Sequence, residues 1–142
     1  MLVYGPEIVE WCASKMDGYS FDNPFGVGII KQDKLVGAVV YDNWRPEAKS
    51  MCVSIALTDK TALNRGILQK LFEYPFSLNG CNRLMTMIDA TNTPSLKLCR
   101  ALGFTQEGSL RKASPKGNDI AVFGMLRDEC RWLNTLQSTS KT

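Results

Sequence analysis

Two junctions between a predicted strand and a predicted helix carry the residues best suited to chemistry. They span residues 57–66 and 89–95, and the first contains Asn64, Arg65 and Gly66 at its end. Free backbone N–H groups and the helix dipole at such junctions favour a bound phosphate. The Arg65 guanidinium can add a charge-assisted contact to the same phosphate. If both helices begin at one end of a single sheet, the two junctions form one site for an anionic ligand.

Several familiar kinds of phosphate and catalytic site are excluded. No Gly-Lys-Ser or Gly-Lys-Thr follows a glycine-rich loop and no G-x-G-x-x-G is present, so neither a P-loop nor an NAD fingerprint is predicted. The chain has no histidine, which excludes a Ser-His-Asp or Cys-His system and removes the usual base at neutral pH. Five cysteines without a C-x-x-C pair indicate reduced, mostly buried thiols, with neither disulfides nor a metal site: Cys12, Cys52, Cys81, Cys99 and Cys130.

Length and charge narrow the function further. The chain has 142 residues, of which 44% are hydrophobic and 22% charged, as in an ordinary globular domain. Residues 1–50 carry seven acidic and five basic side chains, whereas residues 51–142 carry seven and twelve, so the second half suits an anionic ligand. The basic residues are scattered, which favours a small phosphorylated ligand over nucleic acid. No apolar run approaches the roughly 20 residues of a membrane helix and no signal peptide opens the chain, so we expect a soluble, cytoplasmic protein.

The first half of the chain predicts a helix followed by strands. A short helix begins at Pro6, which suits the first turn of a helix. Alternating apolar residues over 25–44, with a turn at Asp33 and Lys34, predict a hairpin. Residues 51–57 form a strand that is apolar on both faces and therefore central in its sheet.

The second half alternates helices and strands. A helix whose apolar stripe includes Leu68 and Phe72 is interrupted by Pro75. Strands follow over 83–89 and 120–126. The helix between these strands has Thr93 as its N-cap and Pro94 at its first position, and it ends at Gly103. A short amphipathic segment closes the pattern with Trp132, Leu133 and Leu136.

Residues 89–98 and 102–111, which read DATNTPSLKL and LGFTQEGSLR, resemble a known family. They match the N-x-x-S-x-x-L and L-G-F-x-x-E-G-x-L-R stretches of the GNAT superfamily of N-acetyltransferases. The resemblance is closest to the ribosomal-protein alanine acetyltransferase-like branch. Further positions match the way that these proteins end: Asp119, residues 124–127, Glu129 and Trp132.

The resemblance implies a fold of the α/β (α+β) class and a co-substrate. It implies a mixed, mostly antiparallel sheet with helices on both faces, in which the central strands 51–57 and 83–89 splay apart. Acetyl-CoA would lie in the gap, with its pyrophosphate at the N-terminus of the following helix. Backbone N–H groups near Ile55, Ala56 and Leu57 would polarise the thioester carbonyl and stabilise the oxyanion while an amine attacks directly.

The predicted phosphate loop departs from the family pattern. That loop usually reads Q/R-x-x-G-x-G/A, whereas residues 61–66 read TALNRG and have Asn64 in place of one glycine, with Gly66 retained. Because asparagine tolerates positive φ better than most residues, the turn remains accessible. In the alternative interpretation, Asn64 only caps the helix and Arg65 is a solvated charge.

The resemblance also gives roles to residues of the second junction. Asn92 would bond the pantetheine arm and Ser95 would lie beside the thioester sulfur; alternatively, Asn92 makes a local turn and Ser95 only favours the helix start. The family often has a tyrosine seven residues after this asparagine to protonate the departing thiolate, and here that position is Cys99. A thiol with its reference pKa of about 8.5 can serve, with Ser95 as a competing donor, although Cys99 can equally be a buried packing residue. Glu107 is expected to organise the sheet.

Together these features predict one GNAT-like domain over residues 1–137 and a disordered tail over 138–142. The domain would move an acetyl group from acetyl-CoA to a primary amine by direct attack. The acceptor would be a protein N-terminus or lysine, or a small amine in an acidic pocket to which Asp22, Asp42 and Glu47 contribute. The alternative is a catalytically silent acyl-CoA-binding module that acts through a protein partner. We expect no nucleic acid, membrane or metal partner and leave a homodimer open.

Overall fold

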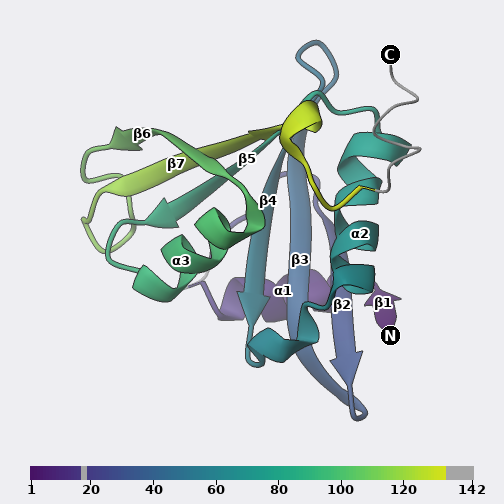
Figure 1. The fold of residues 1–142 in the computed structure, drawn as a ribbon. Helices are drawn as coiled ribbons and strands as arrows, with labels where there is room; N and C mark the ends of the chain where they lie inside the picture. Colours follow the sequence, from purple (N-terminus) through teal and green to yellow (C-terminus); the bar gives the residue numbers. More distant parts are fainter. Residues whose placement is uncertain (17–18, 134–142) are drawn as a thin grey trace.

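The computed structural model describes residues 1–16 and 19–133. Within these residues, seven strands form one sheet in the order β1-β2-β3-β4-β5-β7-β6 (Figure 1). Every neighbouring pair is antiparallel except β4 and β5, which run parallel. The strands are β1 (Leu2–Tyr4), β2 (Phe25–Lys31), β3 (Lys34–Arg45), β4 (Ser50–Leu57), β5 (Arg83–Asp89), β6 (Thr105–Leu110) and β7 (Ile120–Leu126). The helices are α1 (Pro6–Ser14), α2 (Arg65–Glu73) and α3 (Thr93–Leu102).

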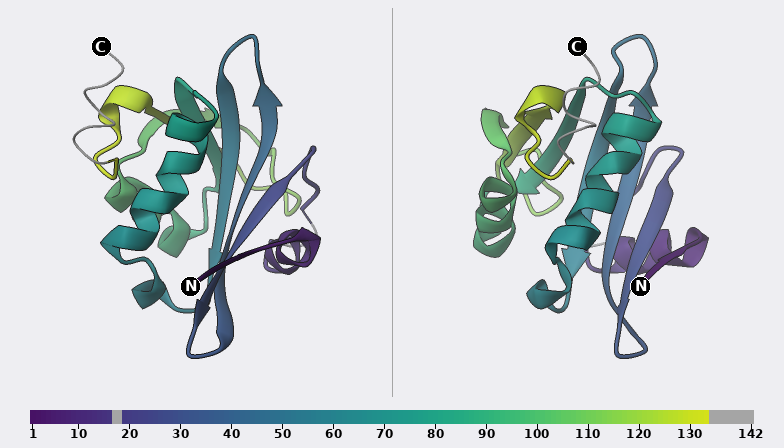
Figure 2. Two further views of the ribbon diagram at one scale, coloured as in Figure 1. Left: turned by 90° about the vertical axis from the view of Figure 1, so that its right-hand side faces the viewer. Right: turned by 45° about the vertical axis from the view of Figure 1, so that its right-hand side comes forward.

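Helices cover both faces of the sheet, with α1 on one side and α2 and α3 on the other (Figure 2). The buried residues on the α1 side are Ile8, Cys12, Ala38, Val40 and Ala56. The β3 residues that alternate with these, Val39 and Tyr41, belong to the larger core beneath α2, together with Leu68 and Phe72. Because successive side chains of a strand point to opposite faces, a strand buried on both faces must be apolar throughout. The predicted fold class, a mixed and mostly antiparallel sheet between helices, is confirmed.

The predicted hairpin is present, with its turn one residue earlier than expected. Gln32 and Asp33 have φ values of 52° and 61°. Positive φ at both central residues is typical of the two-residue turn that joins antiparallel strands. Strand β1 was not predicted, because three residues are too few to show an alternating pattern.

The predicted interruption of the helix at Pro75 is confirmed, since α2 ends at Glu73, two residues earlier. The chain continues beyond α2 as a π-helical turn over Tyr74–Leu78. A proline has no N–H for the carbonyl four residues earlier, which here belongs to Leu71. The hydroxyl of Tyr41 donates to that carbonyl instead. A side chain from β3 thus donates to the oxygen that cannot accept an α-helical bond from Pro75.

The chain after β7 packs back onto the helices. A short 3₁₀ helix spans Arg127–Glu129. Leu133 then belongs to the larger core, and Trp132 packs against it. Leu136 and the predicted tail at 138–142 lie outside the described residues. Among the residues that are described, no helix is long and apolar enough to cross a membrane. All five cysteines lie in the described part and are free.

Candidate active site

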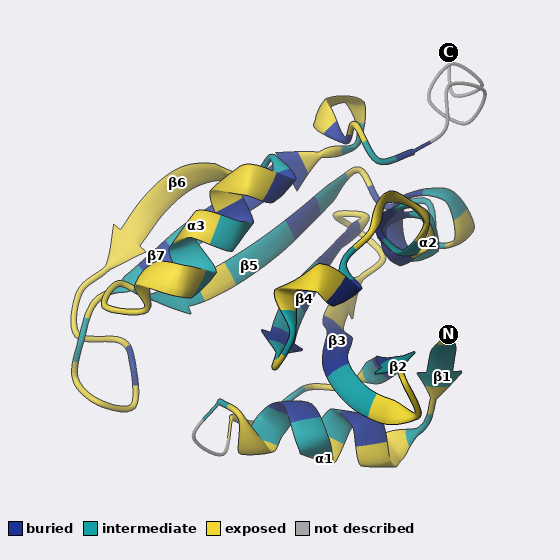
Figure 3. Cartoon of the chain, turned by 60° about the horizontal axis from the view of Figure 1, so that its bottom comes forward, coloured by how far each residue is buried: buried dark blue, intermediate teal, exposed yellow. Residues whose placement is uncertain are grey.

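Strands β4 and β5 pair only at their beginnings. The paired residues are Ser50 with Arg83, Met51 with Leu84, and Cys52 with Met85. Beyond these pairs the two strands diverge, as Figures 1 and 3 show. We call the region between residues 53–57 of β4 and 86–89 of β5 the wedge. The predicted splaying of the two central strands is confirmed.

The edge of β4 that borders the wedge has no strand partner in the described residues, whereas its other edge is fully paired. Strand β3 accompanies β4 as far as the pair Gly37 and Leu57. A free strand edge offers a row of backbone N–H and C=O groups to an extended ligand. Of the three positions expected to polarise a thioester carbonyl, Ile55 and Leu57 direct their backbone N–H groups to this free edge. Ala56 does not, because the register in which Thr58 N–H bonds the Val36 carbonyl makes Ala38 and Ala56 a hydrogen-bonded pair, so the Ala56 N–H faces β3.

Both helices that follow these strands begin at the open end of the wedge, because β4 and β5 are parallel. The two loops that lead to them start with the same turn. Asp59 Oδ1 accepts bonds from the backbone N–H and the hydroxyl of Thr61 at 2.9 and 2.6 Å. Asp89 Oδ1 does the same with Thr91 at 2.8 and 2.7 Å. The Asp-x-Thr spacing could have predicted both turns from the sequence.

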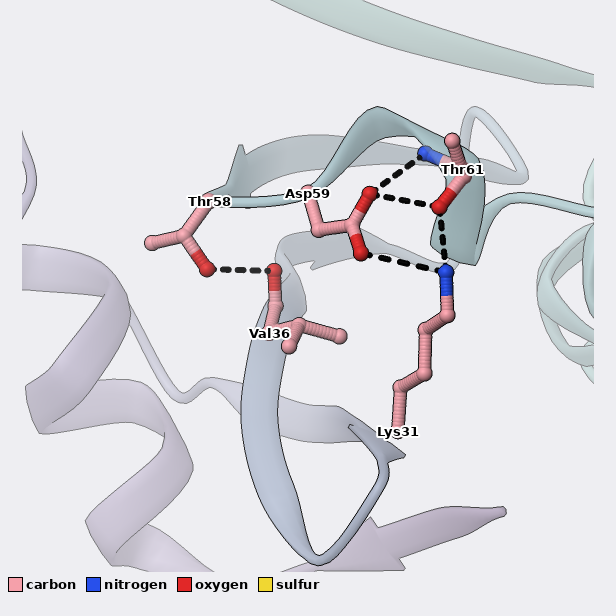
Figure 4. Close-up of polar contacts among 5 residues, drawn as sticks. All are labelled: Lys31, Val36, Thr58, Asp59 and Thr61. Carbon is pink, nitrogen blue, oxygen red and sulfur yellow. Dashed lines mark hydrogen bonds and ion pairs between the residues drawn. The ribbon is translucent and has the colours of Figure 1, made fainter.

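The first loop is also tied to the β2–β3 hairpin (Figure 4). Lys31 Nζ lies 3.1 Å from Asp59 Oδ2 and also bonds the Thr61 hydroxyl. The Thr58 hydroxyl donates to the Val36 carbonyl at 3.3 Å. The Thr61 hydroxyl and then Lys31 hold the pKa of Asp59 below its usual range. These contacts fix the end of β4 and the approach to α2.

Asn64 is the N-cap of α2 and not a left-handed turn residue. Its φ is −84°, and its Oδ1 accepts the N–H of Ile67 at 2.9 Å. Gly66 has no positive φ, and an added Cβ would be in ordinary contact with Asn64 Oδ1 at 3.5 Å. The positive-φ turn expected at Asn64 is therefore wrong, because an asparagine at this position is stabilised more by capping the helix.

Arg65 is the first residue of α2, and its guanidinium lies over an indole ring. Its guanidinium carbon is 5.8 Å from the centroid of Trp132. Trp132 Nε1 donates to the carbonyl of Leu102, in the last turn of α3, at 2.8 Å. Besides packing against the larger core, the Trp132 ring therefore joins the start of α2 to the end of α3.

The second loop is organised by Asp89 and Asn92. Asn118 Nδ2 donates to Asp89 Oδ2 at 3.2 Å, and bonds from Thr91 chiefly lower the pKa of Asp89 to about 2. Asn92 caps α3, since its Oδ1 accepts the N–H of Ser95 at 3.3 Å. The N-cap predicted at Thr93 is therefore wrong by one residue; the predicted helix end at Gly103 is confirmed by its φ of 108°.

Ser95 and Cys99 lie one turn apart on α3 in different environments. Ser95 is half-buried, whereas Cys99 is 5% exposed and belongs to the core beneath the helices. Burial raises the pKa of the Cys99 thiol to about 12. The expectation that this thiol has its reference acidity is therefore wrong, because a thiolate at this position would lose its hydration.

On the opposite face of the sheet, a buried carboxylate lies level with the narrow end of the wedge. Asp42 is 7% exposed and pairs across the strands with Cys52, which is in the last β4–β5 pair. Its Oδ2 accepts the backbone N–H of Asp22 at 3.0 Å, so the Asp22 backbone contributes a donor to this carboxylate. Glu47 does not join them; it lies in the β3–β4 turn, 3.2 Å from Arg45.

Glu107 organises the outer strands, as predicted. It lies in the bulge of β6 between Gln106 and Gly108 and forms an ion pair with Arg83 at 2.7 Å. A Cβ at Gly124 would lie 2.4 Å from Glu107 Oε1, so the carboxylate occupies the space above that glycine. Across residues 1–16 and 19–133, no three His, Cys, Asp or Glu side chains gather closely enough to hold a metal ion.

The sequence profile of the acetyltransferase (GNAT) domain matches residues 7–121. The chain belongs to the GNAT acetyltransferase family. The Bacillus licheniformis "Uncharacterized N-acetyltransferase p20" is 38% identical over 65 residues, which are 44% of this chain and 36% of that protein. The match therefore spans little more than a third of the length of this curated relative.

Solved acetyltransferase structures share the fold. The F149A mutant of Vibrio cholerae spermidine N-acetyltransferase SpeG has a TM-score of 0.66 at 18% identity, over 90% of this chain and 78% of that chain. The structure "Spermidine N-acetyltransferase SpeG K23-Y30 chimera from Vibrio cholerae and hSSAT" has a TM-score of 0.65 at 17% identity, over 78% of this chain and 71% of that chain. At these identities the similarity is one of fold, and it places the wedge within a GNAT sheet.

Proposed function

We propose that this chain transfers the acetyl group of acetyl-CoA to a primary amine. The observation that carries the proposal is the divergence of β4 and β5 after Cys52 and Met85, with two helix N-termini at its open end. Residues 53–57 span about 16 Å at the rise of a strand, which is on the scale of an extended pantetheine arm. Such an arm can pair with the free edge of β4 while its phosphates meet the start of α2.

The residues at the open end fit the anionic part of acetyl-CoA. The N–H groups of Arg65 and Gly66 precede the first intrahelical bond of α2, which Leu68 makes to the Asn64 carbonyl. These donors and the Arg65 guanidinium would bind the pyrophosphate, while Asn64 holds the helix start in place. At the second loop, the Asn92 amide N–H₂ would meet the pantetheine arm and Ser95 would lie beside the thioester.

The transfer is direct. The acceptor ammonium loses a proton, its nitrogen attacks the thioester carbonyl carbon, the C–N bond forms and the C–S bond breaks, and the CoA thiolate leaves and takes up a proton. Backbone N–H groups of Ile55 and Leu57, which face the wedge, would stabilise the oxyanion. The buried, protonated Cys99 is poorly suited to act as a nucleophile, which supports transfer without an acyl-enzyme.

The acceptor is proposed to be a protein N-terminus, following the branch that the sequence resembles, with lysine and small polyamines as alternatives. The test incubates the protein with acetyl-CoA and each of three probes: a peptide with a free N-terminal alanine, a lysine peptide with a blocked N-terminus, and spermidine. Free CoA release measures turnover, and a thermal shift measures binding. Release with at least one probe supports the enzyme.

One observation favours a second candidate, a silent acyl-CoA-binding module. The loop before α2 lacks the left-handed turn expected of a glycine-rich phosphate loop, since Asn64 is an extended N-cap. Stabilisation by acetyl-CoA without release of CoA would identify this module. If acetyl-CoA neither stabilises the protein nor releases CoA, both candidate functions are wrong.

A further inference from the structure

The indole of Trp132 is fixed by the last turn of α3. Its Nε1 donates to the Leu102 carbonyl at 2.8 Å, and Arg131, whose guanidinium carbon is 4.7 Å from the ring centroid, donates to the Ala101 carbonyl. These carbonyls belong to the end of a helix, where the last C=O groups have no intrahelical partner. The ring is therefore a rigid platform, and Arg65 from the start of α2 lies over it.

The charge of Arg65 is otherwise poorly placed for the stability of α2. A helix N-terminus carries a partial positive charge and disfavours a cation. The first turn of α2 contains no acidic residue. Among residues 1–16 and 19–133, no ion pair and no hydrogen bond engages the Arg65 guanidinium. Stacking uses the flat face of a guanidinium, so its N–H edges stay available for an anion.

We propose that Trp132 is a positioning residue that holds Arg65 ready to bind the phosphates of acetyl-CoA, an assignment that rests on the function proposed above. Long side chains lose rotamer entropy when they bind a ligand, and a side chain that is already immobilised loses less. The guanidinium fork also matches phosphate oxygens only in a restricted orientation. A ring that fixes this orientation increases the affinity for phosphate without touching the ligand.

The test is a double-mutant cycle on CoA binding, measured by calorimetry. Trp132→Leu should weaken CoA binding about fivefold to tenfold, as loss of the cation–π contact with Arg65 predicts. Arg65→Ala should weaken CoA at least as much. Adding Trp132→Leu to Arg65→Ala should cause no further loss, because Arg65, through which the ring is proposed to act on CoA, is already absent. Pantetheine, which lacks the nucleotide phosphates, should bind all variants equally.

Two variants separate positioning from a merely structural role. Trp132→Phe keeps an aromatic face and should retain most of the CoA affinity. Trp11→Leu is the matched control, since Lys15 lies 5.1 Å over that ring on α1; it should leave CoA binding unchanged. If Trp132→Leu does not fold, Arg65→Lys decides: it keeps the charge but stacks poorly, so its affinity should fall close to that of Arg65→Ala.

The outcomes distinguish this inference from the proposed function. Two results obtained with a wild-type protein that binds CoA would overturn the positioning role while the proposed function stands. In the first, the losses of CoA affinity in Trp132→Leu and Arg65→Ala multiply in the double variant. In the second, the variants lose as much affinity for pantetheine as for CoA. The positioning role is also overturned if Arg65→Lys binds CoA as the wild type does. If the wild-type protein binds neither CoA nor acetyl-CoA, the proposed function fails and this assignment fails with it.

Discussion

The backbone N–H of Asp22 donates to Oδ2 of Asp42 at 3.0 Å, in a place where the carboxylate has little contact with water. Burial raises the pKa of Asp42, and the bond from Asp22 opposes that rise only in part. In the described part of the chain, the titratable groups whose charges interact with Asp42 are Asp22, which raises the pKa further, Tyr19 and Cys52, and none of them is a cation. A carboxylate that is buried without a cation reduces the stability of the folded chain.

Asp42→Asn is therefore expected to stabilise the protein at neutral pH. The sign follows from the raised pKa: the folded state binds the proton more tightly, so wild-type stability falls as pH rises from the unfolded value near 3.9 through the folded value. Asparagine keeps an oxygen for Asp22 and does not titrate. In thermal melts from pH 3.5 to 8, the melting temperature of Asp42→Asn should increase relative to that of the wild type as pH rises. A lower melting temperature for the variant at pH 8 would contradict this.

Tyr41→Phe should destabilise the protein by about 1–3 kcal/mol, because it removes the hydroxyl that donates to the buried Leu71 carbonyl. Pro75→Ala supplies an N–H four residues after Leu71, which can take over that carbonyl. Urea unfolding should therefore show a smaller loss for Tyr41→Phe in the Pro75→Ala background. Equal losses in both backgrounds would mean that the hydroxyl does not compensate for the proline.

Cys99→Ala should leave kcat nearly unchanged. A thiol with a pKa of about 12 is a weaker acid than the CoA thiol it would protonate, by about 3 units. The loss of a packed sulfur should cost about 1 kcal/mol of stability instead. Ser95→Ala is measured beside it as the variant of the competing donor. A fall in kcat of roughly 10²-fold in Cys99→Ala would restore the thiol as the general acid.

Asp89→Asn should loosen the loop that carries Asn92 and Ser95, and so raise KM for acetyl-CoA. The pKa of Asp89 is lowered to about 2, chiefly by the Thr91 hydroxyl. A lowered pKa contributes stability that is present above the unfolded value near 3.9 and is lost as pH falls toward 2. In thermal melts at acid pH, the melting temperature of Asp89→Asn should fall less than that of the wild type between pH 4 and 2. An unchanged acid profile would show that the carboxylate does not organise this loop.

The sequence predicted best those elements whose signals are local. The predicted strands over 83–89 and 120–126 have the bounds of β5 and β7, because alternating apolar residues report burial directly. Gly103 likewise marks the end of α3 through its own backbone conformation. The wedge followed from the family resemblance, since nothing in either strand alone shows where their pairing stops.

What the sequence did not predict depends on contacts between distant segments. The partner of the Leu71 carbonyl comes from Tyr41, and the platform for Arg65 comes from Trp132, so no local pattern contains either contact. The acidity of Cys99 likewise depends on the core around it and not on its neighbours in the chain. At Asn64, the family pattern suggested a glycine-like turn, whereas the residue itself favours the helix cap that the structure shows.

The short pairing of β4 with β5 makes the sheet mechanically uneven. Strands β1 to β4 form one continuous plate and β5, β7 and β6 another, and three residue pairs form the strip of strand pairing between them. Slow bending of the sheet should therefore concentrate at this strip, as at a hinge. The width of the wedge would then depend on the stiffness of this strip.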